Sequence, residues 1–167
     1  DIVKTSGELS NFPLFINDEA STMPDIRAVC TEKKYKGLDL VIIDYMQLVK
    51  PHAKADTRER EVAEISRSIK EMAMKFEIPI IALSQLNRSS ANKRPTLDTL
   101  RESGAIEQDA DNVVLLHKPD EKDIPSDDVS MYRNLKNNGR DYVEVIIGKQ
   151  RNGPTGMFSM SYNPKHM

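Results

Sequence analysis

The chain has 167 residues, of which 38% are hydrophobic and 30% are charged, and its net charge is −2. This composition is typical of a globular domain of ordinary size and excludes an intrinsically disordered chain. The near-neutral charge excludes a protein that coats nucleic acid by bulk electrostatics, because such domains have a pI above about 9. With 5% aromatic residues and no tryptophan, a groove that stacks single-stranded bases is also disfavoured.

Two further features bear on where the protein works. No apolar run reaches the roughly 18 residues that a membrane span needs. The single cysteine, Cys30, excludes an internal disulfide and a cysteine-ligated zinc cluster. Both features predict a cytoplasmic protein without membrane contact. The first residue is Asp1 rather than methionine, so we expect the chain to be a fragment of a longer protein.

Short apolar runs alternate along the chain with helical patterns, which is typical of βαβ units and a largely parallel sheet. The first apolar run is 14–16. The segment 22–25 (Thr-Met-Pro-Asp) predicts a capping box with a proline in the first turn of a helix. We expect that helix to end at Gly37. Its predicted buried residues are Ile26, Val29 and Cys30.

A strand and a long helix are predicted next. Residues 40–43 (Leu-Val-Ile-Ile) form a continuous apolar run that ends at Asp44, and such a run predicts a strand buried on both faces. Asp56 and Glu59 then open a helix whose apolar residues recur at steps of three and four. The predicted apolar stripe of this helix is Val62, Ile65, Ile69, Met72 or Ala73, and Phe76.

The second half of the chain contains further apolar runs. Residues 80–83 predict another buried strand, and residues 113–116 predict a third central strand, after the polar loop 87–104. The charged, turn-rich segment 118–141 is expected to be a solvated insertion that joins two strands. Residues 143–147 and 157–162 predict a β-hairpin with its turn at 152–154 (Asn-Gly-Pro).

Two polar side chains directly follow two of the predicted strands. Asp44 comes after the run 40–43, and Gln85 comes after the run 80–83 and Ser84. Ligands of a doubly wound sheet bind at the carboxyl ends of its strands, where an acid can hold Mg²⁺ and its waters. An amide at the same edge can contact a γ-phosphate or position water. The alternatives are an aspartate that caps a turn and a glutamine bonded to the loop backbone, and the spacing alone leaves them open.

The polar segment 87–104 is rich in basic and small residues and ends at Gly104. Its basic residues are Arg88, Lys93, Arg94 and Arg101. Such side chains, with backbone amides that a glycine leaves accessible, suit contact with a phosphate backbone without base reading. Glu102 is the exception, because a carboxylate repels phosphate unless it orients Arg101. The alternative is a solvated surface loop, although a loop of this length is typical of a functional segment.

Lys149 and Arg151 lie two residues apart where the predicted hairpin approaches its turn, so their side chains are expected on one side. At a subunit edge, two such cations can reach the nucleotide of a neighbouring subunit as an arginine finger. A finger of this kind neutralises the charge that develops on a transferred phosphoryl group. The alternative is a hairpin turn with two solvated bases.

Several segments together resemble the C-terminal domain of the DnaB-type replicative DNA helicases, which are RecA-like hexameric motors. They fall in order between about residues 38 and 162, and their combined length excludes a chance match. The segments are 41–48 (Val-Ile-Ile-Asp-Tyr-Met-Gln-Leu), 61–68 (Glu-Val-Ala-Glu-Ile-Ser-Arg-Ser), 82–89 (Ala-Leu-Ser-Gln-Leu-Asn-Arg-Ser), 100–111 (Leu-Arg-Glu-Ser-Gly-Ala-Ile-Glu-Gln-Asp-Ala-Asp) and 146–154 (Ile-Ile-Gly-Lys-Gln-Arg-Asn-Gly-Pro).

The resemblance implies an α/β fold with a RecA-like, mostly parallel sheet flanked by helices and a C-terminal β-hairpin. It implies that Asp44 is the Walker B acid for Mg²⁺ and that Gln85 senses the γ-phosphate of ATP. By the same resemblance, the loop with Arg101, Glu102 and Gly104 holds single-stranded DNA, next to the basic Arg88 and Arg94. Lys149 and Arg151 are implied to be finger residues supplied to the next subunit. The implied partners are a homohexamer, primase and a helicase loader, at replication forks on the nucleoid.

One part of the family pattern is missing. The family's Gly-Lys-Thr phosphate loop, its catalytic glutamate and its N-terminal domain and linker are expected before residue 1, and the sequence contains no Gly-x-x-x-x-Gly-Lys-Ser/Thr pattern. We therefore expect residues 1–167 to be the C-terminal part of a motor domain that alone neither binds ATP tightly nor unwinds DNA. Two other interpretations stay open: a RecA-like ATPase of recombination or repair, and a non-catalytic module that contacts neighbouring subunits, primase or a loader.

Overall fold

The structure is a computed structural model that describes residues 7–8, 10–51, 56–86 and 93–166, without the side chains of 101–103 and 166. It has the predicted α/β class. Two strands, β1 (Val41–Ile43) and β2 (Ile80–Ala82), form a parallel pair, and β3 (Asn112–His117), β4 (Asp141–Gln150) and β5 (Gly156–Tyr162) form an antiparallel sheet in that order.

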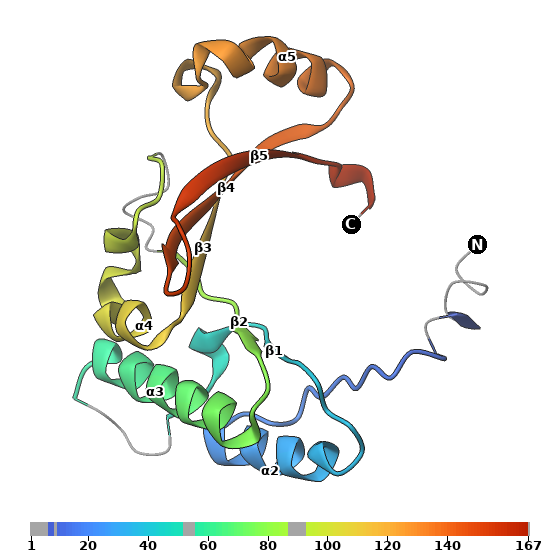
Figure 1. Cartoon of the computed structure of the whole chain (residues 1–167), viewed down its shortest axis with the longest axis vertical. Coiled ribbons are helices and arrows are strands. Elements are labelled where there is room, and N and C mark those ends of the chain that lie inside the picture. Colours follow the sequence, from blue (N-terminus) through green and yellow to red (C-terminus); the bar gives the residue numbers. More distant parts are fainter. Residues whose placement is uncertain (1–6, 9, 52–55, 87–92, 167) are drawn as a thin grey trace.

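The helices lie around these sheets. Helices α2 (Met23–Lys34) and α3 (Arg58–Phe76) lie beside each other next to the parallel pair, and α4 (Gly104–Asp109) lies between α3 and the start of β3 (Figure 1). Helix α5 (Val129–Asn137) lies at the far end of the antiparallel sheet (Figure 1). Within the described ranges, none of the helices combines the length and the apolar character that a membrane crossing requires.

Helix α2 begins as the sequence predicts. The Asp25 backbone N–H donates to Thr22 Oγ1 at 3.3 Å, and the Thr22 backbone N–H donates to Asp25 Oδ2 at 3.0 Å, so the capping box is complete. The helix ends at Lys34, and Gly37 follows in the left-handed region with φ +88°. Cys30 is buried as predicted, whereas Ile26 and Val29 are only half-buried.

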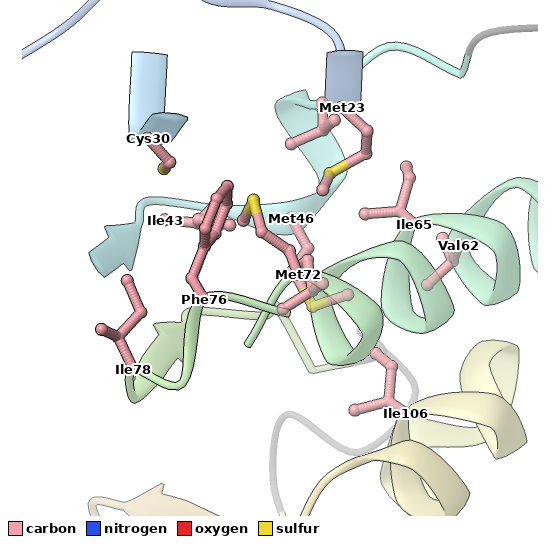
Figure 2. Close-up of a cluster of buried hydrophobic side chains, with 12 residues drawn as sticks. Met23, Cys30, Ile43, Met46, Val62, Ile65, Met72, Phe76, Ile78 and Ile106 are labelled. Atoms are coloured by element: carbon pink, nitrogen blue, oxygen red, sulfur yellow. The ribbon is translucent and has the colours of Figure 1, made fainter. Parts of the chain in front are cut away.

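Helix α3 supplies most of the hydrophobic core. Thr57 caps its N-terminus by accepting a hydrogen bond from the Arg60 backbone N–H, and the chain leaves it through Glu77 with φ 53°. The predicted apolar stripe is buried, with Met72 rather than Ala73 at the ambiguous position. Figure 2 shows the stripe meeting residues from α2, β1, the segment after β1, and α4. The labelled residues are Met23, Cys30, Ile43, Met46, Val62, Ile65, Met72, Phe76, Ile78 and Ile106.

The prediction that the apolar strands are buried on both faces is wrong. Ile43 is buried, but its neighbour Ile42 is exposed, and Ile81 of β2 is exposed as well. Successive side chains of a strand point to opposite faces, and α2 and α3 cover only one face of the pair. Alternation also occurs in β3, where Val113 and Leu115 are buried while Val114 and Leu116 are exposed.

Three predictions about individual segments also need correction. Residues 113–116 form a strand, β3, as predicted, but β3 pairs with β4 in antiparallel register rather than with the parallel pair. The apolar run 14–16 is exposed and forms no regular strand. The polar segment expected as one loop up to Gly104 contains a 3-10 helix, η3 (Leu97–Ser103), which leads into α4.

Two predictions about the C-terminal part are confirmed. The hairpin formed by β4 and β5 has its turn between Gln150 and Gly156. The segment 118–141 joins β3 to β4, and it folds into α5 with short 3-10 turns before it. The segment packs against Tyr142 of β4. Tyr142 is buried, donates its hydroxyl to Asp128 Oδ2 at 2.7 Å and contacts the Tyr132 ring edge-on.

Candidate nucleotide and DNA sites

Asp44 and Gln85 lie at the same edge of the parallel pair. In the register of β1 and β2, Ile43 is the partner of Ala82, so both strands end together. Beyond the strands, the Leu83 backbone N–H donates to the Ile43 carbonyl at 2.9 Å and the Met46 backbone N–H donates to the Leu83 carbonyl at 2.9 Å. The side chains of Asp44 and Gln85 are both exposed. The predicted placement of the two residues at one edge is therefore confirmed.

Gln47 connects the two segments that leave this edge. Its side-chain amide donates to Ser84 Oγ at 2.9 Å and accepts from the Gln85 backbone N–H at 3.3 Å. Its own carbonyl accepts from Arg58 Nη2 at 2.8 Å, which ties the edge to the first turn of α3. Gln47 was not among the predicted site residues. It lies in the segment 41–48 that resembles the family, but its partners Ser84 and Gln85 come from a remote part of the sequence.

The edge fits a hydrated Mg²⁺ ion better than a metal held by protein alone. Among the described residues, no group of three or more His, Cys, Asp or Glu side chains gathers as a metal site. Mg²⁺ usually keeps several waters and takes one or two carboxylates together with phosphate oxygens. The exposed carboxylate of Asp44 matches that requirement.

Arg94 makes an ion pair inside the chain. Its Nε donates to Glu144 Oε2 at 2.9 Å and its Nη2 donates to Glu144 Oε1 at 2.6 Å, and these hydrogen bonds raise the pKa of Arg94. Glu144 lies in β4 with 0% of its surface exposed, while the Arg94 side chain is 46% exposed. Glu144 was not predicted as a site residue, because its partner lies far away in the sequence.

Of the remaining predicted DNA-site residues, Arg101 and Glu102 lie in η3 and Gly104 follows it directly. Arg88 lies outside the described residues, and for Arg101 and Glu102 only the backbone, within η3, is described. Gly104 begins α4 and is exposed, and a side chain built at this position meets no described atom within 4 Å. Among the described atoms, the space beside the Gly104 Cα is therefore open.

The two hairpin cations converge on the junction between α4 and β3. Lys149 Nζ donates to the Glu107 carbonyl at 2.5 Å, near the C-terminus of α4, where the helix dipole favours a cation. Arg151 Nη1 lies 2.9 Å from Asp111 Oδ1. As predicted, the two side chains lie on the same side of the hairpin, and both contact residues of their own chain.

Asp111 also binds a third cation. Its Oδ2 accepts from Lys70 Nζ of α3 at 2.6 Å. This hydrogen bond, and then the charges of Lys70, Arg151 and Lys149, hold the pKa of Asp111 below its ordinary value. The carboxylate is therefore ionised at neutral pH.

Comparison with known proteins identifies the family. The whole chain, residues 1–167, matches the DnaB-like helicase C-terminal domain. The chain belongs to this family. The resemblance read from the segments around Asp44, Gln85, Gly104 and Lys149 is thereby confirmed.

Relatives of this DnaB-like domain include two curated helicases. The chain is 42% identical over 162 residues to the replicative DNA helicase DnaB of Geobacillus stearothermophilus, covering 93% of the chain and 33% of that protein. It is 40% identical over 162 residues to the replicative DNA helicase DnaC of Bacillus subtilis, again covering 93% of the chain and 33% of the relative. The chain thus spans about a third of the length of these relatives.

Solved structures of the family share the fold. A DnaB-like replicative helicase, described with its interactions with primase, superposes with a TM-score of 0.80 at 37% identity, covering 97% of this chain and 39% of that one. A second solved structure, described as an ATPase domain, superposes with a TM-score of 0.77 at 35% identity, covering 97% of this chain and 58% of that one. The α/β fold predicted from the resemblance is therefore that of DnaB-like ATPase domains.

Proposed function

We propose that the chain is the C-terminal part of the motor domain of a replicative DNA helicase, which hydrolyses ATP to translocate on single-stranded DNA and unwind duplex DNA. The observation that carries the proposal is the common edge of Asp44 and Gln85 at the carboxyl ends of β1 and β2. The proposal assigns the family's phosphate loop to no residue of 1–167, because the sequence contains no Gly-x-x-x-x-Gly-Lys-Ser/Thr pattern.

In this proposal the edge of the parallel pair faces the triphosphate of ATP. Asp44 holds Mg²⁺ through its exposed carboxylate, and the ion supplies charge neutralisation at the phosphate oxygens. Gln85 donates its side-chain amide to the γ-phosphate or orients the attacking water. Gln47 supports this role, because its amide fixes Ser84 and the backbone of Gln85 relative to the segment after Asp44.

Lys149 and Arg151 act in the proposal on the ATP of the adjacent subunit in a homohexamer. Their convergence at one junction supports a shared target. The Arg151 side chain is 52% exposed, and its ion pair with Asp111 joins Nη1 to Oδ1 at 2.9 Å, whereas a guanidinium carries five N–H donors. The other donors therefore remain able to bind a phosphate oxygen.

The DNA site of the proposal is the segment of Arg88, Arg94, Arg101, Glu102 and Gly104. The open backbone at Gly104 supports close approach of a phosphate. Arg94 uses Nε and Nη2 for Glu144, which leaves N–H donors on a half-exposed group.

Interaction with primase is proposed because a structural relative is described with primase. The proposal also includes a helicase loader as a partner and places the protein in the cytoplasm, at replication forks.

The finger role is tested by Arg151→Ala in the full-length protein. We expect the rate of ATP hydrolysis to fall by about 10³-fold or more, as for other arginine fingers, while affinity for single-stranded DNA stays within a few-fold. The measurements are steady-state hydrolysis with saturating DNA and fluorescence anisotropy of a labelled oligonucleotide. Arg133→Ala is the matched control, because Arg133 is also an exposed arginine paired with an acid, Glu121, at 2.7 Å. Equal losses of hydrolysis and DNA affinity in Arg151→Ala contradict the finger role.

A non-catalytic role is favoured for residues 1–167 on their own, because no phosphate loop occurs within them. Calorimetric titration with ATP and Mg²⁺ is expected to show no micromolar binding to this chain. Light scattering after size exclusion adds a second readout. A ring indicates that the subunit contacts are retained, and a monomer indicates a folding unit without them.

A further inference from the structure

Asp111 is the residue at which α3, the α4–β3 junction and the hairpin turn meet. Each oxygen of its carboxylate pairs with a different cation. Oδ1 lies 2.9 Å from Arg151 Nη1, and Oδ2 lies 2.6 Å from Lys70 Nζ. The Asp111 carbonyl also accepts the backbone N–H of Arg151 at 2.9 Å. Asp111 therefore fixes both the main chain and the guanidinium of Arg151.

We propose that Asp111 is a positioning residue for Arg151, which it orients for the phosphate of the neighbouring subunit, and that Lys70 anchors Asp111 to α3. This inference rests on the proposed function, since it requires Arg151 to act on a nucleotide. Asp111 does not touch the nucleotide in this scheme. It acts only through Arg151.

Lys70, the proposed anchor, lies on α3, which supplies most of the hydrophobic core. Lys70 lies between Ile69 and Met72, which are both buried in the core, so the backbone that carries Lys70 is held by packing. A second bond from the same helix reaches the same junction, because Ser66 Oγ donates to Asp109 Oδ2 at 2.8 Å. A guanidinium held against such a support loses less side-chain entropy when it binds phosphate.

The charge state of Asp111 suits this role. The Asp111 carboxylate is ionised at neutral pH, like that of an ordinary aspartate, so it forms an ion pair with Arg151 at 2.9 Å. The Asp111 side chain is 49% exposed, which places the pair at the surface where a neighbouring subunit has access. A buried pair would hold Arg151 away from any partner.

A purely structural role is the competing explanation, and a matched control separates the two. Asp141, at the start of β4, is also a carboxylate that takes one cation on each oxygen, Lys118 at 2.6 Å and Lys136 at 3.1 Å. Its pKa is also lowered, first by its hydrogen bond to Lys118. Asp141 begins β4 whereas Arg151 follows its end, and the Asp141 side chain is 14% exposed against 49% for Asp111. Asp141→Asn therefore reports the loss of a doubly paired carboxylate away from Arg151.

The experiment measures kcat and KM for ATP in the full-length protein with saturating single-stranded DNA. We expect Asp111→Asn to lower kcat about tenfold, because a displaced catalytic group loses rate steeply with distance, while KM for ATP changes less than twofold. Asp111→Glu keeps the charge and is expected to recover most of that loss. Lys70→Met is expected to lower kcat in the same direction by a smaller factor. Asp141→Asn is expected to match the wild type.

The double variant Asp111→Asn with Arg151→Ala decides the mechanism. If Asp111 acts through Arg151, the double variant hydrolyses ATP no more slowly than Arg151→Ala alone. If the two losses multiply, or if Asp111→Asn keeps the wild-type kcat while Arg151→Ala does not, the inference is overturned and the finger proposal stands. If Arg151→Ala itself keeps the wild-type kcat, the finger proposal fails and the inference fails with it. Thermal unfolding of Asp111→Asn and Asp111→Glu separates a folding defect from a loss of positioning.

Discussion

At the scale of single residues, Glu144 is the side chain whose environment demands most explanation. It is a carboxylate with no exposed surface in the middle of a sheet, and its partner is the bidentate guanidinium of Arg94. A buried charge is tolerated only when it is paired and hydrogen-bonded. The pair therefore fixes the start of the segment that leads to η3 on the face of β4.

Arg94→Ala leaves the buried Glu144 carboxylate without its partner. We expect the free energy of unfolding to fall by about 2 kcal/mol, which is less than for a fully buried pair because Arg94 is half-exposed. Urea denaturation of the 167-residue chain provides the measurement. Arg60→Ala removes an exposed pair with Asp56 and is expected to cost less than about 1 kcal/mol. Similar losses in the two variants would show that Glu144 finds other partners.

The sequence predicted some site residues and missed others for a physical reason. Asp44 and Gln85 were found because each follows an apolar run directly, and strand ends in a parallel sheet share an edge. Gln47, Asp111 and Glu144 were missed because their significance depends on partners that are remote in sequence. Hydrogen bonds of that kind leave no periodic signal.

At the scale of elements, hydrophobic periodicity predicted the buried residues reliably where only one face of an element packs against the core. Helix α3 repeats its apolar residues at helical spacing over 19 residues, and the predicted stripe is the buried one. The short apolar runs were less informative, because a run of four residues does not reveal which neighbour covers it. This explains why 40–43 was expected to be buried on both faces and why 113–116 was assigned to the parallel sheet.

Substitutions in α3 test this account of the core. Met72 is 1% exposed, and we expect Met72→Ala to lower the free energy of unfolding by about 2–5 kcal/mol through lost burial and a cavity. Met74→Ala is the matched control, because Met74 lies on the same helix but is 67% exposed, and its expected change is within about 0.5 kcal/mol. Chemical denaturation followed by circular dichroism measures both. A large loss in Met74→Ala would mean that the exposed side of α3 is covered.

At the scale of the whole molecule, the described residues leave apolar side chains exposed on both sheets. Ile42 and Ile81 lie on the parallel pair, and Leu116 and Phe158 lie on the antiparallel sheet. Contiguous exposed apolar surface promotes association. The molecule therefore combines a packed core around α3 with uncovered sheet faces.

This surface predicts concentration-dependent self-association of the isolated chain. We expect Leu116→Thr to reduce the association seen by light scattering and to leave the midpoint of urea unfolding nearly unchanged, because Leu116 is exposed. Leu115→Thr, one residue away on the covered face, is expected to lower that midpoint instead, because it places a hydroxyl in the buried cluster with Leu100 and Val113. Equal effects of the two substitutions on unfolding would contradict the assignment of the faces.

The spacing of the paired strands along the chain also sets an order of assembly. Only residues 151–155 separate β4 from β5, so this hairpin closes a short loop and forms in about 1–10 μs. Val41 pairs with Ile80 across a long loop that contains the whole of α3. The entropy of closing that loop delays the pairing. During refolding, we therefore expect the β4–β5 hairpin, whose first strand carries Lys149, to form before the edge that carries Asp44 and Gln85.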